Sequence, residues 1–343
     1  MIYRYIIRPI LFKFNPETVH DLVMFLVSRF TFIYPIIRLI YSPSNHNPVI
    51  INRIKFRNPL GLAAGLDKNG TAIRFWDAAG FSHIEVGTVT PKPQPGNPKP
   101  RLFRLIKEKA IINRMGFNNN GADELRKNIL KAKKKIKQDF VIGVNIGKNK
   151  TTSLENAGSD YIFCLENLYD TADFFTVNIS SPNTEGLREL QEEKYLDKLL
   201  DEISSKNREL ANGKNVNPKV IFLKIAPDLA DKEIEQIYNL VVKYNINGII
   251  ATNTTISREG LNTETKEEGG MSGMPLKMMS NAVLKKLNEL NLKNQNTKIT
   301  LIGDGGIFSN QDYLDKLSSG AELIQIYTSF IYEGLNIVKK ILK

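Results

Sequence analysis

The segment NISSPNTEGL, residues 178–187, combines residue types that can bind a substrate and move a proton, yet it contains no conventional base. Asn178, Ser180, Ser181 and Asn183 lie within six residues, and no His, Cys or Asp stands among those six. A serine hydroxyl is a poor base at neutral pH, because a matched pKa is what makes proton transfer efficient. The function of this loop therefore depends on what the rest of the chain places beside it.

Other apolar segments also end in polar or glycine-rich residues, namely GLDKNG, GTVTP, NIGKNK, ATNTT and GDGG. Lys224 differs from these because it lies inside an apolar run, IFLKIAP. An unpaired buried lysine is costly, so a charged ligand beside Lys224 is the favoured interpretation, and an ion pair at the rim of a barrel is the alternative. Many amides and hydroxyls together with two lysines suit a polar, planar, anionic small molecule.

Glycines near the end of the chain form a candidate phosphate site. They stand in Gly269-Gly270-Met271-Ser272-Gly273 and Gly305-Gly306, and Tyr327-Thr328 follows. Glycine lets backbone N–H groups approach a phosphate closely, and barrels often bind phosphate with the loops after strands 7 and 8. The alternative is that these glycines only form turns. The chain has no GxGxxG after its first strand and no Walker A motif, which disfavours those two nucleotide folds.

The elements that must position these residues are predicted to be strands and helices in regular alternation. Short β-rich segments lie at residues 58–65, 83–90, 140–147, 174–180, 220–227, 247–254, 298–306 and 323–330, with helical patterns between them. Strands that alternate with helices pair in parallel, and this number of units predicts a (β/α)8 TIM barrel; a doubly wound sheet is the main alternative. In a barrel the polar strand ends meet on one face.

Composition limits the classes of function. Hydrophobic residues make up 42% of the 343 residues and charged residues 24%, as in a globular protein with a large core. The single cysteine, Cys164, excludes an intrachain disulfide and a CxxC metal pair, so we expect no metal site and a reducing compartment. The net charge of +11 fits an anionic lipid surface or a lysine-rich surface. No nucleic-acid motif is present, and we expect no nucleic-acid partner.

Residues 1–42 differ from the rest, and we interpret them as an N-terminal helical arm preceding a barrel of residues 43–343. Asn15-Pro16-Glu17 has the form of a helix start, and Pro35 is expected to break the pattern. No uninterrupted apolar run approaches the roughly 20 residues of a membrane span. Two amphipathic helices with basic flanks suit a membrane-contacting arm, and ordinary packing on the barrel is an equal alternative on pattern alone.

The chain closely resembles the membrane-associated, quinone-using class of the dihydroorotate dehydrogenase family. The motifs that carry the resemblance are NPLGLAAGLDKNG, EVGTVTPKPQPGNPKPRLFRL, INRMGFNNNG, NIGKNK, NISSPNTEGLR, KIAPDL, IATNTT, GGMSG and QIYTSF. The family has a (β/α)8 barrel that binds FMN and an N-terminal helical arm. The soluble class places Cys at the base position, whereas this chain has Ser181, which favours the quinone class.

The resemblance implies oxidation of dihydroorotate to orotate in pyrimidine biosynthesis, with a membrane quinone as final acceptor, on the cytoplasmic side of the cell membrane. The arm would contact an anionic lipid surface. Ser181 would be the catalytic base. FMN would contact Ala64, Gly65, Thr88, Asn145, Asn178, Lys224, Thr252, Gly273, Gly306, Tyr327 and Thr328. The substrate would contact Lys68, Asn113, Arg114, Met115, Gly116, Phe117, Asn178, Asn183, Asn253 and Thr254, and the quinone tunnel would include His20 and Arg104.

Asp304 departs from the pattern of the family, where a small apolar residue is expected. A carboxylate beside a phosphate would repel it, so we expect Asp304 to point outward or to pair with a lysine. Two other functions compete with the resemblance. A Schiff-base aldolase would use Lys224 as its nucleophile, and a peripheral membrane scaffold would need only the arm.

Overall fold

A computed structural model describes residues 2–43, 47–262, 265–294 and 296–343. Eight parallel strands close into a barrel, which confirms the (β/α)8 prediction. In chain order they are β3 (Leu60–Leu62), β4 (His83–Val89), β7 (Val141–Ile146), β8 (Phe174–Asn178), β9 (Val220–Ile225), β10 (Gly248–Ala251), β12 (Thr300–Asp304) and β13 (Leu323–Ile326). The last strand pairs with the first, with Ile324 opposite Leu60, and this closure excludes the doubly wound alternative.

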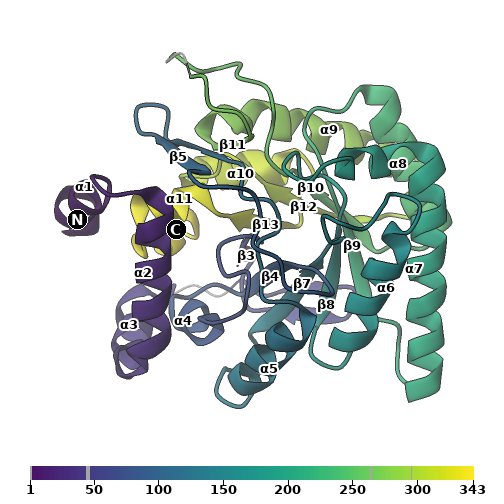
Figure 1. Cartoon of the computed structure of the whole chain (residues 1–343), viewed down its shortest axis with the longest axis horizontal. Coiled ribbons are helices and arrows are strands. Elements are labelled where there is room, and N and C mark those ends of the chain that lie inside the picture. The colour runs from purple at the N-terminus through teal and green to yellow at the C-terminus, as the bar shows by residue number, and fades with distance from the viewer. Residues whose placement is uncertain (1, 44–46, 263–264, 295) are drawn as a thin grey trace.

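Helices surround the barrel (Figure 1). They are α4 (Ile73–Ala78), α5 (Ala122–Lys133), α6 (Ala157–Leu168), α7 (Glu193–Lys214), α8 (Asp231–Lys243), α9 (Lys277–Lys293), α10 (Asn310–Ser318), α11 (Thr328–Glu333) and α12 (Asn336–Ile341). On α7 the buried residues Leu196, Leu199, Leu200 and Ile203 recur at intervals of one helical turn, so one face packs on the strands. Cys164 on α6 is buried in the same core.

The interior of the barrel changes from apolar to polar along its axis. Phe174, Phe222, Ile250 and Ile302 form an apolar cluster across the strands. Alternate residues of a strand point to the same face, so Lys224 and Asp304, two positions beyond Phe222 and Ile302, also point into the barrel. The carboxyl ends of the strands therefore present polar side chains above an apolar floor.

Two small sheets were not predicted. The hairpin of β1 (Val49–Ile51) and β2 (Ile54–Phe56) packs Ile51 and Phe56 against the apolar floor of the barrel. The strands β5 (Leu102–Leu105), β6 (Ala110–Asn113) and β11 (Gly270–Gly273) form an antiparallel sheet. Gly270 pairs with Asn113 in that sheet, which joins two distant segments at the active face.

The arm contains η1 (Tyr3–Ile7), α1 (Arg8–Leu11), α2 (Pro16–Arg29), η2 (Thr31–Ile33) and α3 (Tyr34–Tyr41). Asn15 caps α2, because its side chain accepts hydrogen bonds from the backbone N–H groups of Glu17 and Thr18 at 3.0 and 3.2 Å. The break in the helix comes at Phe30 and not at Pro35 as predicted. Pro35 lies in the first turn of α3, where a missing N–H costs nothing.

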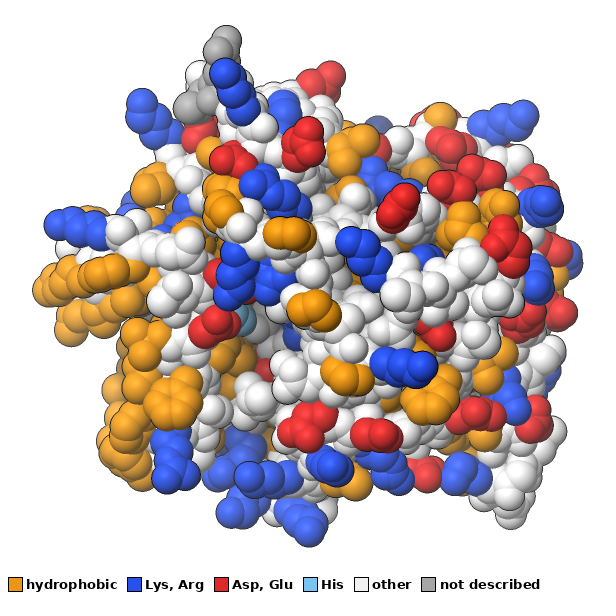
Figure 2. Space-filling view, viewed as in Figure 1, with side chains coloured by type: hydrophobic (Ala, Val, Ile, Leu, Met, Phe, Trp, Pro, Cys, Tyr) orange, Lys and Arg blue, Asp and Glu red, His pale blue; other side chains and the backbone are white. Residues whose placement is uncertain are grey.

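One side of the arm packs on the barrel, as the packing interpretation predicted. Tyr34 and Ile37 of α3 are buried in the core, so this helix packs on the barrel. The other side of the arm exposes an apolar surface, which Figure 2 shows as a continuous orange band and which includes Leu22, Phe25, Phe32, Ile36 and Leu39. No single helix in the described part of the chain is long and apolar enough to cross a membrane; α2 with residues Thr31–Tyr41 would be, but the two are bent by 71°.

Candidate active site

A cavity opens at the carboxyl ends of the barrel strands, and we call it the active-site cavity. It collects nearly all the residues that the resemblance assigns to FMN, although they come from most of the length of the chain. Those that line it are Ala64, Gly65, Thr88, Asn178, Lys224, Thr252, Gly273, Gly306, Tyr327 and Thr328. The strand-end glycines and hydroxyls predicted as a phosphate site therefore lie beside one another in space.

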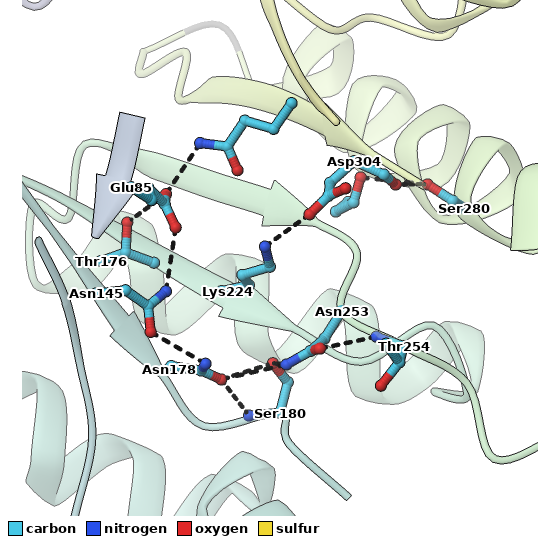
Figure 3. Close-up of polar contacts among 12 residues, drawn as sticks. Glu85, Asn145, Thr176, Asn178, Ser180, Lys224, Asn253, Thr254, Ser280 and Asp304 are labelled. Atoms are coloured by element: carbon cyan, nitrogen blue, oxygen red, sulfur yellow. Dashed lines mark hydrogen bonds and ion pairs between the residues drawn. The ribbon is translucent and has the colours of Figure 1, made fainter. Parts of the chain in front are cut away.

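Asn145 lies behind the lining and holds two residues of it in place. The Thr88 hydroxyl and the Asn178 amide both donate to Asn145 Oδ1, at 2.6 and 3.1 Å. The Asn145 amide donates in turn to Glu85 Oε2 at 3.1 Å. Asn145 thus orients Thr88 and Asn178, and its own amide is held by the Glu85 carboxylate inside the barrel (Figure 3).

Glu85 is a buried carboxylate that the sequence interpretation missed. Besides Asn145, it accepts hydrogen bonds from the Thr176 hydroxyl at 2.7 Å and from the Gln325 amide at 3.0 Å. Gln325 also lines the active-site cavity. The sequence could have indicated both residues, because Glu85 in HIEVG and Gln325 in LIQIY are polar residues inside apolar strands, as Lys224 is.

The lining of the cavity contains buried polar atoms that are free to bond to a ligand. Thr252 Oγ1, Thr254 Oγ1 and Gln325 Oε1 are buried with no partner in the described part of the protein, and all three residues line the cavity. Buried polar atoms without a partner are rare, so these atoms indicate a polar ligand. At Gly273 and Gly306 the backbone has φ values of +103° and +76°, and an added Cβ would meet backbone atoms of Lys109 and side-chain or backbone atoms of Lys277 within 2.5 Å.

Lys224 forms a buried ion pair with Asp304, with 2.6 Å between Nζ and Oδ2. Asp304 therefore pairs with a lysine, one of the two arrangements predicted for it, and Lys224 has the barrel ion pair that was the alternative to a ligand contact. Burial lowers the pKa of Lys224, but the negative charges of Asp304 and Glu85 outweigh burial and raise it. A lysine that stays protonated is unsuited to attack a carbonyl, and this disfavours the aldolase alternative.

The residues assigned to the substrate, with the exception of Arg114, also line the active-site cavity. Lys68, Asn113, Met115, Gly116, Phe117, Asn178, Asn183, Asn253 and Thr254 all line it. The Asn183 amide donates to Asn113 Oδ1 at 3.1 Å, and the Asn253 amide donates to the Ser180 hydroxyl at 3.0 Å. Arg114 does not bring its side chain to the cavity, because its guanidinium pairs with Glu267 at 2.6 Å.

Lys68 is the second cation of the cavity. Burial lowers its pKa to about 7. Its ammonium donates to Asn118 Oδ1 and, at 3.3 Å, to the Gly116 carbonyl, and these neutral acceptors leave its charge uncompensated by direct contact. An anionic ligand group beside Lys68 would therefore gain a charge-assisted hydrogen bond and would favour the protonated lysine.

Ser181 also lines the active-site cavity. Its oxygen accepts a hydrogen bond from the Asn183 backbone N–H at 3.3 Å, and this is the only bond of its hydroxyl within the described residues. The hydroxyl proton is therefore available to a water or a ligand. No carboxylate or imidazole of the described chain is hydrogen-bonded to Ser181, which agrees with the loop sequence.

A second, apolar cavity of about 480 Å³ lies between the arm and the barrel, and we call it the arm cavity. His20 and Arg104 both line it, together with Val23, Met24, Trp76 and Phe330. Burial lowers the pKa of His20, which favours the neutral imidazole. Arg104 stacks over the Phe12 ring at 4.4 Å and donates to the Phe14 carbonyl at 3.0 Å. Tyr327 lines both cavities, so a short path separates them.

Comparisons with known proteins agree with this arrangement. Residues 48–343 match the family model described as dihydroorotate dehydrogenase. A protein of Vibrio parahaemolyticus named dihydroorotate dehydrogenase (quinone) is 48% identical over 100% of this chain and 99% of its own length. A protein of Shewanella denitrificans with the same name is 50% identical over 96% of this chain and 95% of its own.

Solved structures give the same result. The crystal structure of the dihydroorotate dehydrogenase of Eimeria tenella in complex with ferulenol superposes with a TM-score of 0.86 at 37% identity, covering 95% of this chain and 89% of that one. A ligand-free structure of the same enzyme superposes with a TM-score of 0.85.

Proposed function

This chain belongs to the dihydroorotate dehydrogenase family, and from that premise we infer that it oxidises dihydroorotate to orotate in pyrimidine biosynthesis and passes the electrons to a quinone. One observation supports the chemistry most directly: Ser181, Lys68 and four asparagines line one cavity. The oxidation removes a proton from C5 of the substrate and a hydride from C6. The site must therefore hold an anionic ring, take up a proton and accept a hydride.

FMN is the proposed hydride acceptor, and when bound it supplies the redox chemistry that no side chain can provide. The residues that would hold it are the FMN set named above, with Asn145 orienting Thr88 and Asn178 from behind. The unpartnered oxygens of Thr252 and Gln325 supply hydrogen-bonding groups for its ring system or its ribityl chain. Lys224 places a positive charge in the same cavity.

Binding of the substrate is assigned to Lys68 and the amides. The Lys68 ammonium would pair with the substrate carboxylate as a point charge. Asparagine side chains carry both a donor and an acceptor, which matches the imide edge of a pyrimidine ring. Asn113, Asn183 and Asn253 are held by bonds to one another and to Ser180, so they are oriented before the substrate binds. This preorganisation is what positions C5 for proton removal.

Ser181 is assigned the removal of the C5 proton. Its oxygen has a lone pair available beside the bond from Asn183 N, and its own proton can pass to a water in the cavity. The bond from the Asn183 backbone N–H favours negative charge on the oxygen, which partly compensates for the high pKa of a hydroxyl. A relay of this kind needs no adjacent imidazole or carboxylate.

The arm cavity is assigned to the quinone, with His20 and Arg104 near the quinone ring. Its apolar lining suits an isoprenoid carrier, and Tyr327 separates it from the active-site cavity. Residues 1–42 form a separate arm on the barrel of residues 43–343 and hold the protein as a peripheral protein on an anionic membrane, at the cytoplasmic side of the cell membrane. The exposed apolar surface of the arm supports this placement (Figure 2).

An absorption spectrum of the purified protein, recorded before and after anaerobic addition of dihydroorotate, tests the proposal. A flavin spectrum that bleaches with dihydroorotate, and recovers on addition of a quinone, is the expected result. A flavin that does not bleach would overturn the substrate, and a colourless protein would overturn the cofactor. Borohydride trapping on Lys224 would then test the aldolase alternative.

A further inference from the structure

Lys224 and Asp304 reach the active-site cavity from two strands that are not neighbours. Lys224 belongs to β9 and Asp304 ends β12, and β10 lies between these strands, with Ile250 opposite both Lys224 and Ile302. The two side chains approach across β10 to 2.6 Å (Figure 3). Both are buried and both line the cavity. The ion pair is therefore part of the surface that a bound cofactor contacts.

Asp304 is the only carboxylate that lines this cavity within the described part of the protein. The other charged residues in the lining are Lys68 and Lys224, so Asp304 halves the positive charge of the site. Two further charges face the pair. Glu85 lies deeper in the barrel, and Lys316 lies behind β12, where it donates to the Ser280 hydroxyl, which donates to the Asp304 carbonyl, each at 2.5 Å.

A buried charge next to a redox group acts on its reduction potential. Two-electron reduction of a flavin adds negative charge to the ring, which a protonated lysine in the cavity stabilises. A carboxylate bound to that lysine cancels most of the stabilisation. The interaction is strong here because the pair is buried, where the effective dielectric constant is far below that of water and salt screens little.

We propose that Asp304 lowers the reduction potential of the bound flavin by neutralising Lys224, so that electrons pass more favourably from the flavin to the quinone. The inference rests on the proposed function, since it assumes that a flavin occupies this cavity. In this role Asp304 sets how favourable reduction of the flavin by dihydroorotate is relative to its oxidation by the quinone. Reduction by dihydroorotate becomes less favourable by the same factor by which oxidation by the quinone becomes more favourable.

The test is the midpoint potential of the flavin in the holoenzyme, measured by reductive titration against an indicator dye. Asp304→Asn keeps the shape of the side chain and removes its charge. We expect the equilibrium constant for two-electron reduction to rise about tenfold or more, a shift of about 30 mV or more. Asp304→Glu retains the charge and should stay near the parent value. Asp231→Asn, which removes the partner of Lys286 on the exposed surface, should leave the potential unchanged.

Two outcomes would overturn the inference: an unchanged potential in Asp304→Asn, or an equal rise in Asp304→Asn and Asp304→Glu, which would indicate packing and not charge. Should Asp304→Asn fail to fold because Lys224 loses its partner, the double variant Lys224→Met/Asp304→Asn leaves no unpaired charge. Its potential should lie near the parent value if Asp304 neutralises Lys224, and a shift of about 30 mV or more would overturn the inference. A second readout is the ratio of reduced to oxidised flavin at a fixed ratio of dihydroorotate to orotate, which should rise by the same factor.

The outcomes separate this inference from the proposed function. The dye titration needs no substrate, so a flavin that fails to bleach with dihydroorotate would overturn the function while the titration still decides the role of Asp304. A holoenzyme that bleaches with dihydroorotate and shows no shift in Asp304→Asn would overturn the role of Asp304 alone. A protein that binds no flavin would overturn both.

Discussion

Ser181 has no base hydrogen-bonded to it within the described residues, so the proposed proton transfer relies on the hydroxyl oxygen itself and a mobile water. We predict that Ser181→Ala slows reduction of the flavin by dihydroorotate by roughly 10²–10⁴-fold, the usual contribution of a positioned general base. Stopped-flow absorbance of the holoenzyme measures that rate. FMN should remain bound, since the other residues of its site are intact.

Ser159→Ala is a suitable control for this variant, because within the described residues the Ser159 hydroxyl bonds only to the backbone carbonyl of Asn156, at the start of α6. It should leave the reduction rate unchanged. A rate in Ser181→Ala within threefold of the parent would remove Ser181 from the proton transfer.

Lys68 links substrate binding to pH. Its pKa of about 7 lies well below the ordinary 10.5, so the free enzyme holds an ammonium below pH 7 and a neutral amine above it. A bound carboxylate favours the ammonium and raises this pKa again. We predict that the Kd for orotate, measured from the flavin spectrum, is flat below pH 7 and rises up to about tenfold per pH unit above it.

Lys68→Met removes the titrating group, so orotate should bind weakly at pH 6 and without this pH dependence up to pH 8.5. Persistence of the same pH dependence in Lys68→Met would assign it to another group. Lys92→Met, a lysine outside the cavity lining, is the matched control and should keep the parent profile.

At the scale of the elements, sequence periodicity predicted the barrel strands because each is a short apolar run bounded by turn residues and followed by a helix. It missed β5, β6 and β11, which hold four residues each and are stabilised by pairing into one sheet that joins distant segments. Gly270 pairs with Asn113, which is far away in the sequence, so no local sequence pattern predicts this pairing. Most of the residues that the motifs assigned to the site line one cavity. The contact between Lys224 and Asp304 could not be predicted in this way, because it depends on the order of the strands in the barrel.

The first turn of α2 is attached to the barrel by a buried ion pair. Glu17 accepts from Arg101 at 2.7 Å and lies 3.2 Å from Lys99. Removing one partner of a buried pair leaves the other charge without compensation, which costs about 3–5 kcal/mol. Arg101 also donates to the carbonyls of Pro95 and Asn97, so we predict that Glu17→Gln costs about 3 kcal/mol in the free energy of unfolding or releases α2 locally.

Denaturant unfolding and hydrogen exchange of α2 distinguish these two results. Glu209→Gln, which removes an exposed partner of Lys206, should change the free energy of unfolding by less than about 1 kcal/mol.

Burial raises the pKa of Glu17, but the bonds to Arg101 and Lys99 outweigh it and lower that pKa below 4.5. The stabilisation is therefore present above pH 4.5 and lost as the pH falls further. A Glu17→Gln protein with parent stability and exchange would contradict the role of the pair.

At the scale of the whole molecule, we expect the apolar surface of the arm and the positive charge of the chain to act on the same partner, an anionic bilayer. Phe25, Phe32 and Leu39 have exposed fractions of 63%, 74% and 84%. Residues 1–42 carry five basic and two acidic side chains, within a chain of net charge +11. Apolar burial and electrostatic attraction add when an amphipathic helix binds an anionic bilayer.

This combination predicts how binding depends on lipid and salt. The protein should bind vesicles that contain anionic lipid more tightly than neutral ones, and added salt should remove only the difference, because salt screens charges at the surface and leaves apolar burial intact. Replacing Phe25, Phe32 and Leu39 together by serine should abolish binding to neutral vesicles and leave a weak, salt-sensitive attraction to anionic ones. Flavin reduction by dihydroorotate should be unaffected, since none of the three residues lines the active-site cavity.

The triple variant is preferable to deletion of residues 1–42, because deletion would also remove Tyr34 and Ile37 from the core and Arg38 from its ion pair with Asp77. Its reduction of a water-soluble quinone should match the parent, whereas its reduction of a long-chain quinone in vesicles should fall with binding. Equal loss with both quinones would mean that the arm shapes the arm cavity and does not serve as a membrane contact. We therefore expect membrane binding and electron transfer to be separable in this molecule, because none of the three exposed residues replaced in the triple variant lines the arm cavity.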